Sequence, residues 1–245
     1  VHEKIIQNNG RAFADFSPYA PSGGEPAAFC GSPIHDPSGN IIGTFVVQIP
    51  LDQINAVMTT RYGLGETGES FLVGQDKLMR SDSFLDPIHH SVVGSFANPT
   101  QGTIDTEGTR NALAGIEGAE VILDYNGNSV LSCYEPLQIE DITWAILTEI
   151  DVEEAFCPKD EQGEYFFEKY TEAYGYYDLF LINPDGHCFY TVCQEADYQS
   201  NFVNGKYSSS GMGKLTREVL ETKNFGLADF EPYAPSNDDP CGFIA

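Results

Sequence analysis

The alternation of apolar and polar positions predicts a chain of short strands and helices. Short runs rich in β-branched and aromatic residues, bounded by turn residues, predict strands. The predicted strands are 12–19, 26–34, 41–49, 69–73, 77–81, 120–125, 129–135, 143–150, 177–182, 188–192, 226–233 and 241–245. Apolar residues at helical spacing predict helices at 50–60, 109–114 and 213–222. A further helix is predicted over 152–174, broken near Pro158 and Gly163.

Two turn sequences indicate that several of these strands pair as antiparallel hairpins. Asn126-Gly127-Asn128 separates the strands 120–125 and 129–135, and Asn-Gly favours the tight turns of hairpins. Asn183-Pro184-Asp185-Gly186 joins 177–182 to 188–192 in the same way.

An internal repeat relates the two ends of the chain. ADFSPYAPSGGEPAAF at 14–29 and ADFEPYAPSNDDPCGF at 228–243 are identical at ten of 16 positions without a gap, at an offset of 214 residues. Upstream, Ile5 and Ile6 fall opposite Val219 and Leu220. The chain therefore begins and ends in the same part of a repeated ββαβββ unit, while a second unit of that kind lies intact between them.

Five sequence runs resemble the double Cache extracellular sensor domain of methyl-accepting chemotaxis proteins and sensor kinases. They are YYDLFLINPDG (176–186), DFEPYAPS (229–236), IGTFVVQIPLDQINAVM (42–58), GLGETGESFLVGQDKLMRSDS (63–83) and TWAILTEIDVEEAF (143–156). The resemblance implies an α+β fold of two PAS-like (Cache) modules. Each module would be a curved five-stranded antiparallel sheet with flanking helices, and one module is split between the N- and C-terminal ends.

On this resemblance the chain divides into four parts. Residues 1–50 form the C-terminal half, strands 3–5, of a membrane-distal-type module, and 51–150 form a membrane-proximal-type module with a bridging helix. Residues 151–176 are a linking helix, and 177–245 begin the next distal-type module. The resemblance also implies an extracellular or periplasmic location.

The resemblance further implies a small-molecule site on the concave face of each sheet. The expected ligand-binding residues of the distal-type module are Tyr190, Tyr207, Ser209, Asp229, Tyr233 and Phe243. Those of the proximal-type module are Arg80, Asp82 and Tyr125. Aromatic rings would stack on the ligand and carboxylates or hydroxyls would orient it, although each residue taken singly also fits ordinary packing. No complete amino-acid-binding signature of the double Cache sensors is present, so the sequence does not support recognition of amines or amino acids.

The charge balance narrows the range of partners. Twelve Lys and Arg against 37 Asp and Glu leave a net charge of −25, which excludes nucleic acid as an expected partner and disfavours anionic lipid surfaces. No apolar stretch approaches the length of a membrane span. We expect no resident cofactor. The acidic loop Asn237-Asp238-Asp239, with Glu231 and Asp229, could hold calcium, but a solvated loop is the default interpretation.

No motif supports catalysis or a metal centre. The GLGETG run at 63–68 fits GxGxxG, yet a helix precedes it and a strand follows, so we interpret it as a loop. His89, His90 and His187 lack ligand spacing and are expected to be solvent-exposed loop residues. GxSxG is absent, and no Ser or Cys has an identifiable His/Asp pair. The chain is not expected to be an enzyme.

The cysteines leave two alternatives open. Their even number is compatible with up to three disulfides in an oxidising compartment, which we favour, whereas buried free thiols are the alternative. The candidates are Cys30, Cys133, Cys157, Cys188, Cys193 and Cys241.

Two functions follow from these observations. The first is an extracellular ligand-binding sensory module, as one unit of a tandem or head-to-tail array. The second is a structural subunit of a filament, built by strand complementation between neighbouring copies and by intermolecular disulfides through Cys30 or Cys241. Both predict neighbouring copies as partners, because a half-sheet with free edges and an exposed apolar face requires a complement.

Overall fold

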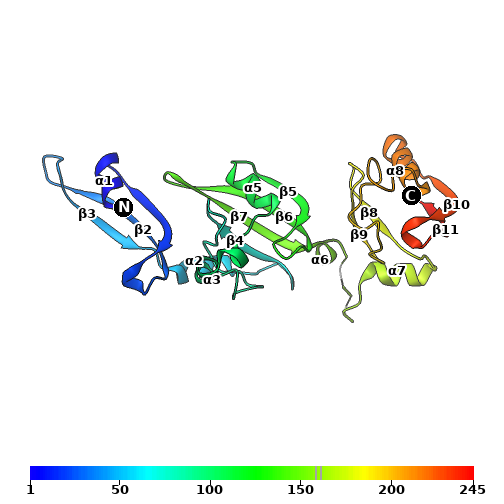
Figure 1. The fold of residues 1–245 in the computed structure, drawn as a ribbon, viewed down its shortest axis with the longest axis horizontal. Coiled ribbons are helices and arrows are strands. Elements are labelled where there is room, and N and C mark those ends of the chain that lie inside the picture. Colours follow the sequence, from blue (N-terminus) through cyan, green and yellow to red (C-terminus); the bar gives the residue numbers. More distant parts are fainter. Residues whose placement is uncertain (158, 161) are drawn as a thin grey trace. The chain divides into compact units, whose positions relative to one another are not determined.

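The computed structural model describes residues 1–157, 159–160 and 162–245, and the chain divides into two compact units. Unit 1 is Val1–Asp151 and unit 2 is Val152–Ala245 (Figure 1). Each unit is described by itself. The predicted helix break at Pro158 lies outside the described residues, whereas Gly163 adopts a left-handed φ of 82° between two separate helices.

The first half of unit 1 is a three-stranded antiparallel sheet in the order β1-β2-β3. Its elements are α1 (His2–Asn8), β1 (Ala12–Pro18), the 3-10 turn η1 (Ala20–Ser22), β2 (Pro26–His35) and β3 (Ile41–Gln48). The three strands predicted at 12–49 are confirmed. Helix α1 was not predicted because only Ile5 of its residues is buried, so its apolar pattern is short.

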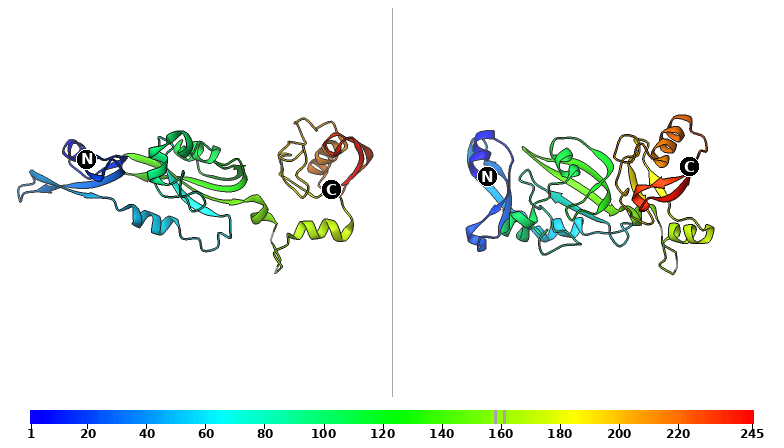
Figure 2. Two further views of the ribbon diagram at one scale, coloured as in Figure 1. Left: turned by 60° about the horizontal axis from the view of Figure 1, so that its bottom comes forward. Right: turned by 45° about the vertical axis from the view of Figure 1, so that its right-hand side comes forward.

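The second half of unit 1 is a four-stranded antiparallel sheet in the order β4-β7-β6-β5. Helix α5 packs across β6 and β7 (Figures 1 and 2). The strands are β4 (Glu69–Val73), β5 (Gly118–Leu123), β6 (Ser129–Ile139) and β7 (Ile142–Asp151). The helices are α2 (Leu51–Met58), α3 (Val92–Ala97), α4 (Pro99–Gly102) and α5 (Glu107–Leu113).

The prediction of five strands in this module is wrong, because residues 77–81 contribute only one bridge, between Met79 and Val73. Lys77 adopts a left-handed φ of 63°. The backbone N–H of Leu72 donates to the hydroxyl of Ser81 rather than to a strand carbonyl. A side chain thus takes the place of the next ladder hydrogen bond and ends the pairing.

The two sheets of unit 1 share one core. Phe13 of β1 packs edge-on against Trp144 of β7, with ring centroids 5.7 Å apart. Phe71 and Leu147, on the paired strands β4 and β7, are fully buried. Deleting a buried side chain of this size costs about 2–5 kcal/mol. The Phe13–Trp144 contact joins β1 to the second sheet, and all four side chains belong to one core cluster.

Unit 2 contains two separate two-stranded sheets, β8-β9 and β10-β11, with a helix packed on the second. Its elements are α6 (Val152–Phe156), α7 (Phe166–Tyr174), β8 (Phe180–Ile182), β9 (Cys188–Thr191), α8 (Gly211–Thr222), β10 (Leu227–Tyr233), the 3-10 turn η2 (Ala234–Ser236) and β11 (Asp239–Ile244). The predicted ββαββ order is confirmed, but a joined sheet is not. In unit 1, β7 joins β4 to β6 in one sheet. Among the described residues of unit 2, no strand joins β8-β9 to β10-β11 in this way.

The repeated sequences fold alike. β1 and β10 pair with β2 and β11 in matching registers, with an irregularity between Ala14 and Ser17 and again between Ala228 and Glu231. The tyrosine before each 3-10 turn has nearly the same backbone angles, φ −119° and ψ 107° at Tyr19 against −121° and 110° in the second copy. The two copies are therefore structurally equivalent strand pairs.

Candidate functional site

A buried aromatic cluster in unit 2 contacts one buried carboxylate through Tyr233. The hydroxyl of Tyr233, at the end of β10, donates a hydrogen bond of 2.5 Å to Oδ2 of Asp197, which is fully buried. The Tyr233 ring lies 4.9 Å from the ring of Phe243 and 6.4 Å from the ring of Tyr207, measured between centroids. Burial raises the pKa of the Tyr233 hydroxyl, and its hydrogen bond to Asp197 raises it further. The phenol therefore stays a donor to the carboxylate.

Two buried carboxylate oxygens in the described part of the chain have no hydrogen-bond partner: Oδ1 of Asp197 and Oδ2 of Asp178. The other oxygen of Asp178 accepts from the backbone N–H groups of Val192 and Cys193 at 2.9 and 3.1 Å. Burial raises the pKa of each carboxyl. An unpaired buried carboxylate is unfavourable, and a cation or an N–H donor relieves it.

The two carboxylates act on the same hairpin. Burial raises the pKa of the Cys188 thiol on β9 to about 12, and the charges of Asp197 and Asp178 add to that effect. The backbone of Cys193, just after β9, is held by Asp178. When ionised, these two carboxylates favour a cationic group over an anionic one.

The expected ligand-binding residues of unit 2 divide into two groups. The first group lies in the aromatic cluster around Asp197: Tyr207, Tyr233 and Phe243. The second group lies outside it: Tyr190, Ser209 and Asp229. Tyr190 is buried against Phe167, with ring centroids 5.7 Å apart, whereas Ser209 and Asp229 are exposed. The role of all six in binding stays a prediction.

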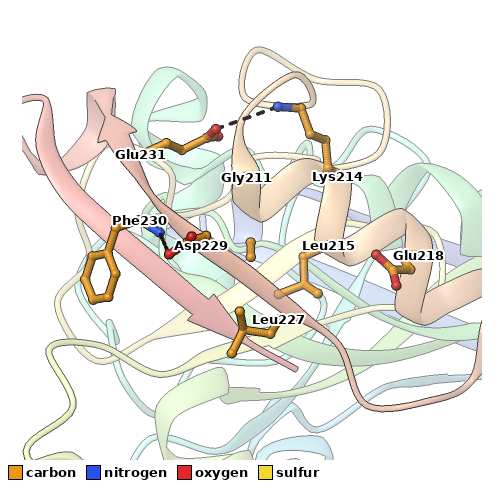
Figure 3. Close-up of a pocket in the computed structure, with 9 residues that line it drawn as sticks. Gly211, Lys214, Leu215, Glu218, Leu227, Asp229, Phe230 and Glu231 are labelled. Carbon is orange, nitrogen blue, oxygen red and sulfur yellow. Dashed lines mark hydrogen bonds and ion pairs between the residues drawn. The ribbon is translucent and has the colours of Figure 1, made fainter.

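Asp229 opens onto a shallow groove between α8 and β10 rather than onto the aromatic cluster (Figure 3). The groove has a volume of about 290 Å³ and is lined by Leu215 and Leu227 together with charged residues. Lys214 of α8 and Glu231 of β10 lie 3.8 Å apart as an ion pair across it. The groove is thus open and mixed in character.

The expected proximal residue Tyr125 belongs to a buried polar cluster. Its hydroxyl donates to Oε1 of Glu69 at 2.6 Å and lies 3.1 Å from the Ser83 hydroxyl, which itself donates to Oε2 of Glu69. The Tyr125 ring lies 4.1 Å from the ring of His90. Tyr125 also lines a pocket of about 440 Å³ whose other walls include Arg110. This cluster adjoins a second space of small-molecule size.

The other two predicted ligand-binding residues of the proximal-type module, Arg80 and Asp82, form ion pairs and hydrogen bonds with other residues of unit 1. Arg80 is 2% exposed, and its guanidinium forms ion pairs with Asp15 at 2.7 Å and Asp76 at 2.9 Å. Asp82 accepts from the Asn55 amide and from the backbone N–H of Val92, both at 2.7 Å. These contacts give both side chains a structural role, and ligand binding by them stays a prediction.

Glu149 is a buried carboxyl with a raised pKa, a type of residue found at functional sites, and it was not among the residues predicted from the sequence. It lies opposite Glu69 in the β4–β7 ladder, is 3% exposed and accepts a hydrogen bond from Ser132. Burial raises its pKa to about 7, and the charges of Asp124 and Glu69 act in the same direction. A buried Glu opposite another Glu was visible in the sequence only once the strand register was known.

The expectation that His90 is exposed is wrong. His90 is 5% exposed, and its Nδ1 lies 2.9 Å from Oδ2 of Asp86, while His89 shares the same oxygen at 3.1 Å. A turn in the loop brings Asp86 against both histidines. The sequence analysis considered only the ligand spacings of helices and strands, so it did not predict this contact. Within residues 1–157, 159–160 and 162–245, no group of three or more His, Cys, Asp or Glu side chains forms a metal site.

Comparison with known proteins decides the family. The family model for the Cache domain, dCache_1, matches residues 4–158. The chain belongs to the Cache domain family. The resemblance drawn from the five sequence runs is thereby confirmed, and no curated protein matches the chain. The split of one Cache module between the two ends of the chain is not tested by this match and stays a prediction.

Solved structures similar to this Cache chain are sensory domains. The periplasmic sensory domain of the Campylobacter jejuni chemoreceptor Tlp1 is 15% identical over 64% of this chain and 58% of its own, with a TM-score of 0.46. The ligand-binding domain of the Pseudomonas fluorescens chemoreceptor CtaA, in complex with L-leucine, is 14% identical over 63% and 59%, with a TM-score of 0.42. The extracellular domain of the putative histidine kinase mmHK1S-Z2 is 22% identical over 60% and 54%, with a TM-score of 0.41.

The chain spans less than two thirds of the length of each of these structures. The first of these structures is described as a periplasmic sensory domain, the second as a ligand-binding domain and the third as an extracellular domain. The predicted extracellular or periplasmic location agrees with the membership of this chain in the Cache domain family. None of these names describes a filament or a repeat array, so assembly stays a prediction. Across the described helices, none is both long and apolar enough to cross a bilayer.

The favoured disulfides do not form within the Cache chain. All six cysteines lie among the described residues and are free thiols. Cys157 and Cys188 are buried, Cys30 and Cys241 are half-buried, and Cys133 and Cys193 are exposed. The even count misled because disulfide pairing depends on which cysteines the fold brings together, and a count carries no such information. Intermolecular bonding through Cys30 or Cys241 stays a prediction.

Proposed function

We propose that the chain is the ligand-binding part of a sensory protein, and that unit 2 recognises a small molecule bearing an ammonium or similar N–H donor group. The observation that carries this proposal is the unpaired Oδ1 of Asp197, fully buried beside Tyr233. A charge-assisted hydrogen bond from the ligand would satisfy this oxygen. Asp178 supplies a second unpaired oxygen near the same hairpin.

The surrounding side chains support a small organic cation over a hydrated metal ion. The rings of Tyr207 and Phe243 pack against Tyr233, the side chain that donates to Asp197, and aromatic side chains of this kind attract organic ammonium groups. The ligand-binding roles of Tyr207, Tyr233 and Phe243 belong to this proposal. Those of Tyr190, Ser209, Asp229, Arg80, Asp82 and Tyr125 remain separate predictions.

Calorimetric titration with pairs of compounds that differ in one amino group tests the proposal. Amines and amino acids are expected to bind, and their deaminated counterparts are not, as with alanine against propionate. Asp197→Asn is expected to weaken binding about 10- to 100-fold, the loss of one charge-assisted hydrogen bond. Asp238→Asn is the matched control, since Asp238 lies in an exposed loop, and it should bind as the wild type does.

The pH dependence gives a second readout. Because burial raises the pKa of Asp197, affinity for an ammonium group should fall as the pH drops through that raised pKa and the carboxylate is protonated. Equal binding of amines and their deaminated counterparts, or full affinity in Asp197→Asn, would overturn the proposal.

Assembly of copies is a separate prediction. Strand β3 exposes Ile42, Phe45 and Val47, side chains that a further strand or helix would cover. Light scattering over a range of concentrations, with and without reductant, measures it independently of ligand binding. A single-chain mass under all of these conditions would contradict it.

A further inference from the structure

The two copies of the repeated strand have different surroundings. We call Phe13, Asp15 and Phe16 the β1 face, and their counterparts 214 residues later, Leu227, Asp229 and Phe230, the β10 face. The β1 face is covered by unit 1. The β10 face is open, and the contrast between them identifies the chemistry that would cover it.

In unit 1 the β1 face packs on an arginine and a tryptophan. Phe13 and Phe16 are 6% and 4% exposed, and their ring centroids lie 5.7 and 6.1 Å from that of Trp144. Asp15 accepts from Nε and Nη2 of Arg80 at 2.7 and 2.8 Å, and from Nε1 of Trp144 at 3.1 Å. We call Arg80 and Trp144 the Arg–Trp face.

In unit 2 the corresponding side chains face solvent. Leu227 and Phe230 are 65% and 74% exposed, and Asp229 is exposed as well, with its carboxylate bound to the backbone N–H of Phe230 (Figure 3). In that view Phe230 points away from helix α8. Exposed large apolar residues around a carboxylate are the composition of a docking surface rather than of a solvated strand.

The β10 face is already in the conformation that docks in unit 1. Oδ1 of Asp229 accepts from the backbone N–H of Phe230 at 2.8 Å, as Oδ1 of Asp15 accepts from Phe16 at 2.7 Å. The supporting Tyr–Phe pair is the same in both copies, with ring centroids 4.9 Å apart and planes at 69° behind β1 and 70° behind β10. Little conformational ordering would therefore oppose docking.

We propose that the β10 face is a docking site for a Cache module that presents an arginine beside a tryptophan, as the Arg–Trp face of unit 1 does. Asp229 would form the bidentate ion pair with the arginine, and Phe230 and Leu227 would cover the tryptophan. The partner is defined by charge and shape complementarity to an interface that the same chain already forms once.

A second copy with an opened Arg–Trp face is the probe. Asp15→Lys places a positive charge beside Arg80, so that the β1 face is repelled and the Arg–Trp face is exposed. Asp229→Lys in the same chain prevents its own β10 face from binding there. Wild-type chain, whose β10 face is intact, is expected to bind this double variant with the mass of two chains in light scattering. The single variant Asp229→Lys should bind the double variant at least 10-fold more weakly than the wild type does. Trp144 is the single tryptophan, so its emission reports that the face has opened.

A folded double variant with exposed Trp144 that does not bind wild type would overturn the proposal. If circular dichroism shows that the double variant is unfolded, the wild type alone provides the test, since its β10 face can exchange with the β1 face of a second copy at high concentration. That dimer should be lost in Phe230→Lys and kept in Phe225→Lys. Phe225 is the control because it is 75% exposed and its counterpart in unit 1 is the exposed Arg11. The β1 strand of the same chain competes with this exchange at an effective concentration of about 1 mM. Failure of the wild type to dimerise at concentrations up to that value would overturn the proposal.

Discussion

At the scale of single residues, buried charge decides how unit 1 responds to its surroundings. Glu149 and Arg80 are both nearly inaccessible to solvent, yet their situations differ. Arg80 has two carboxylate partners, whereas Glu149 has one hydroxyl donor and faces Glu69 across the ladder. Burial disfavours both charged forms, but the carboxylate partners of Arg80 outweigh that cost, whereas Glu149 has no cationic partner to offset it.

Glu149→Gln should make unit 1 less sensitive to pH. The pKa of Glu149 is raised from 4.5 to about 7 in the folded state, so the contribution of Glu149 to wild-type stability is most favourable at or below pH 4.5 and falls as the pH rises to about 7. The loss is about 3 kcal/mol at most. The variant should match wild type near pH 4.5 and exceed it at pH 8 in urea unfolding. Glu135→Gln, at an exposed strand position, should change neither value, and equal pH profiles for Glu149→Gln and wild type would refute the prediction.

Asp15→Ala should destabilise unit 1 strongly, because it leaves a buried guanidinium with only Asp76 as its carboxylate partner. We expect a loss of about 3 kcal/mol in the free energy of unfolding. The counterpart substitution Asp229→Ala, on the exposed β10 face, should stay within about 0.5 kcal/mol of wild type. Denaturant unfolding of the two variants makes the comparison, and equal effects would contradict the assigned environments.

Among the elements of unit 2, helix α8 covers the β10-β11 sheet. Leu215 on its inner side is 2% exposed, and the helix packs on β10 and β11. Ser210 caps its N-terminus by accepting a hydrogen bond from the backbone N–H of Gly213 at 3.2 Å. The local sequence thus sets where α8 begins, and its buried side chains set where it packs.

Ser210→Ala should lower the stability of unit 2 by about 1 kcal/mol, the usual effect of losing a serine cap. Ser209→Ala is the control, because Ser209 is the exposed neighbour and does not cap the helix. Thermal unfolding followed by circular dichroism distinguishes the two. A Ser210→Ala variant as stable as Ser209→Ala would show that the cap contributes nothing.

At the scale of the whole molecule, the chain has two hydrophobic cores, one in each unit. Phe71 and Leu147 lie in the first core, and Phe202 and Tyr233 lie in the second. Separate cores favour separate cooperative transitions. The candidate site around Asp197 lies wholly in unit 2, so a ligand there should act on one transition only.

Differential scanning calorimetry should therefore show two transitions. Asp15→Ala should shift only the transition of unit 1, and Ser210→Ala or a bound amine only that of unit 2. At a ligand concentration 100 times its Kd, the stabilisation of unit 2 should be about 2.7 kcal/mol. A single transition that every variant shifts equally would show that the two units unfold as one.

Strands, hairpins and the repeat could be predicted from the sequence, because turn chemistry and apolar periodicity act between near neighbours. The strand 69–73 was predicted with its observed bounds, and the hairpin turns at 126–128 and 183–186 stand where expected. The same local signals, with the family resemblance, pointed to Tyr207, Tyr233 and Phe243, which pack in one cluster.

The environments of these residues could not be predicted from the sequence, because they depend on contacts between distant parts of the chain. Ser81 ends a predicted strand through a hydroxyl contact with Leu72, and His90 is buried because a turn returns it to Asp86. Most clearly, Phe16 and Phe230 occupy equivalent places in the same repeated sequence, yet one is 4% and the other 74% exposed. Local sequence fixes conformation, but solvent exposure and charge pairing depend on which distant surfaces meet, and those contacts are set by the whole fold.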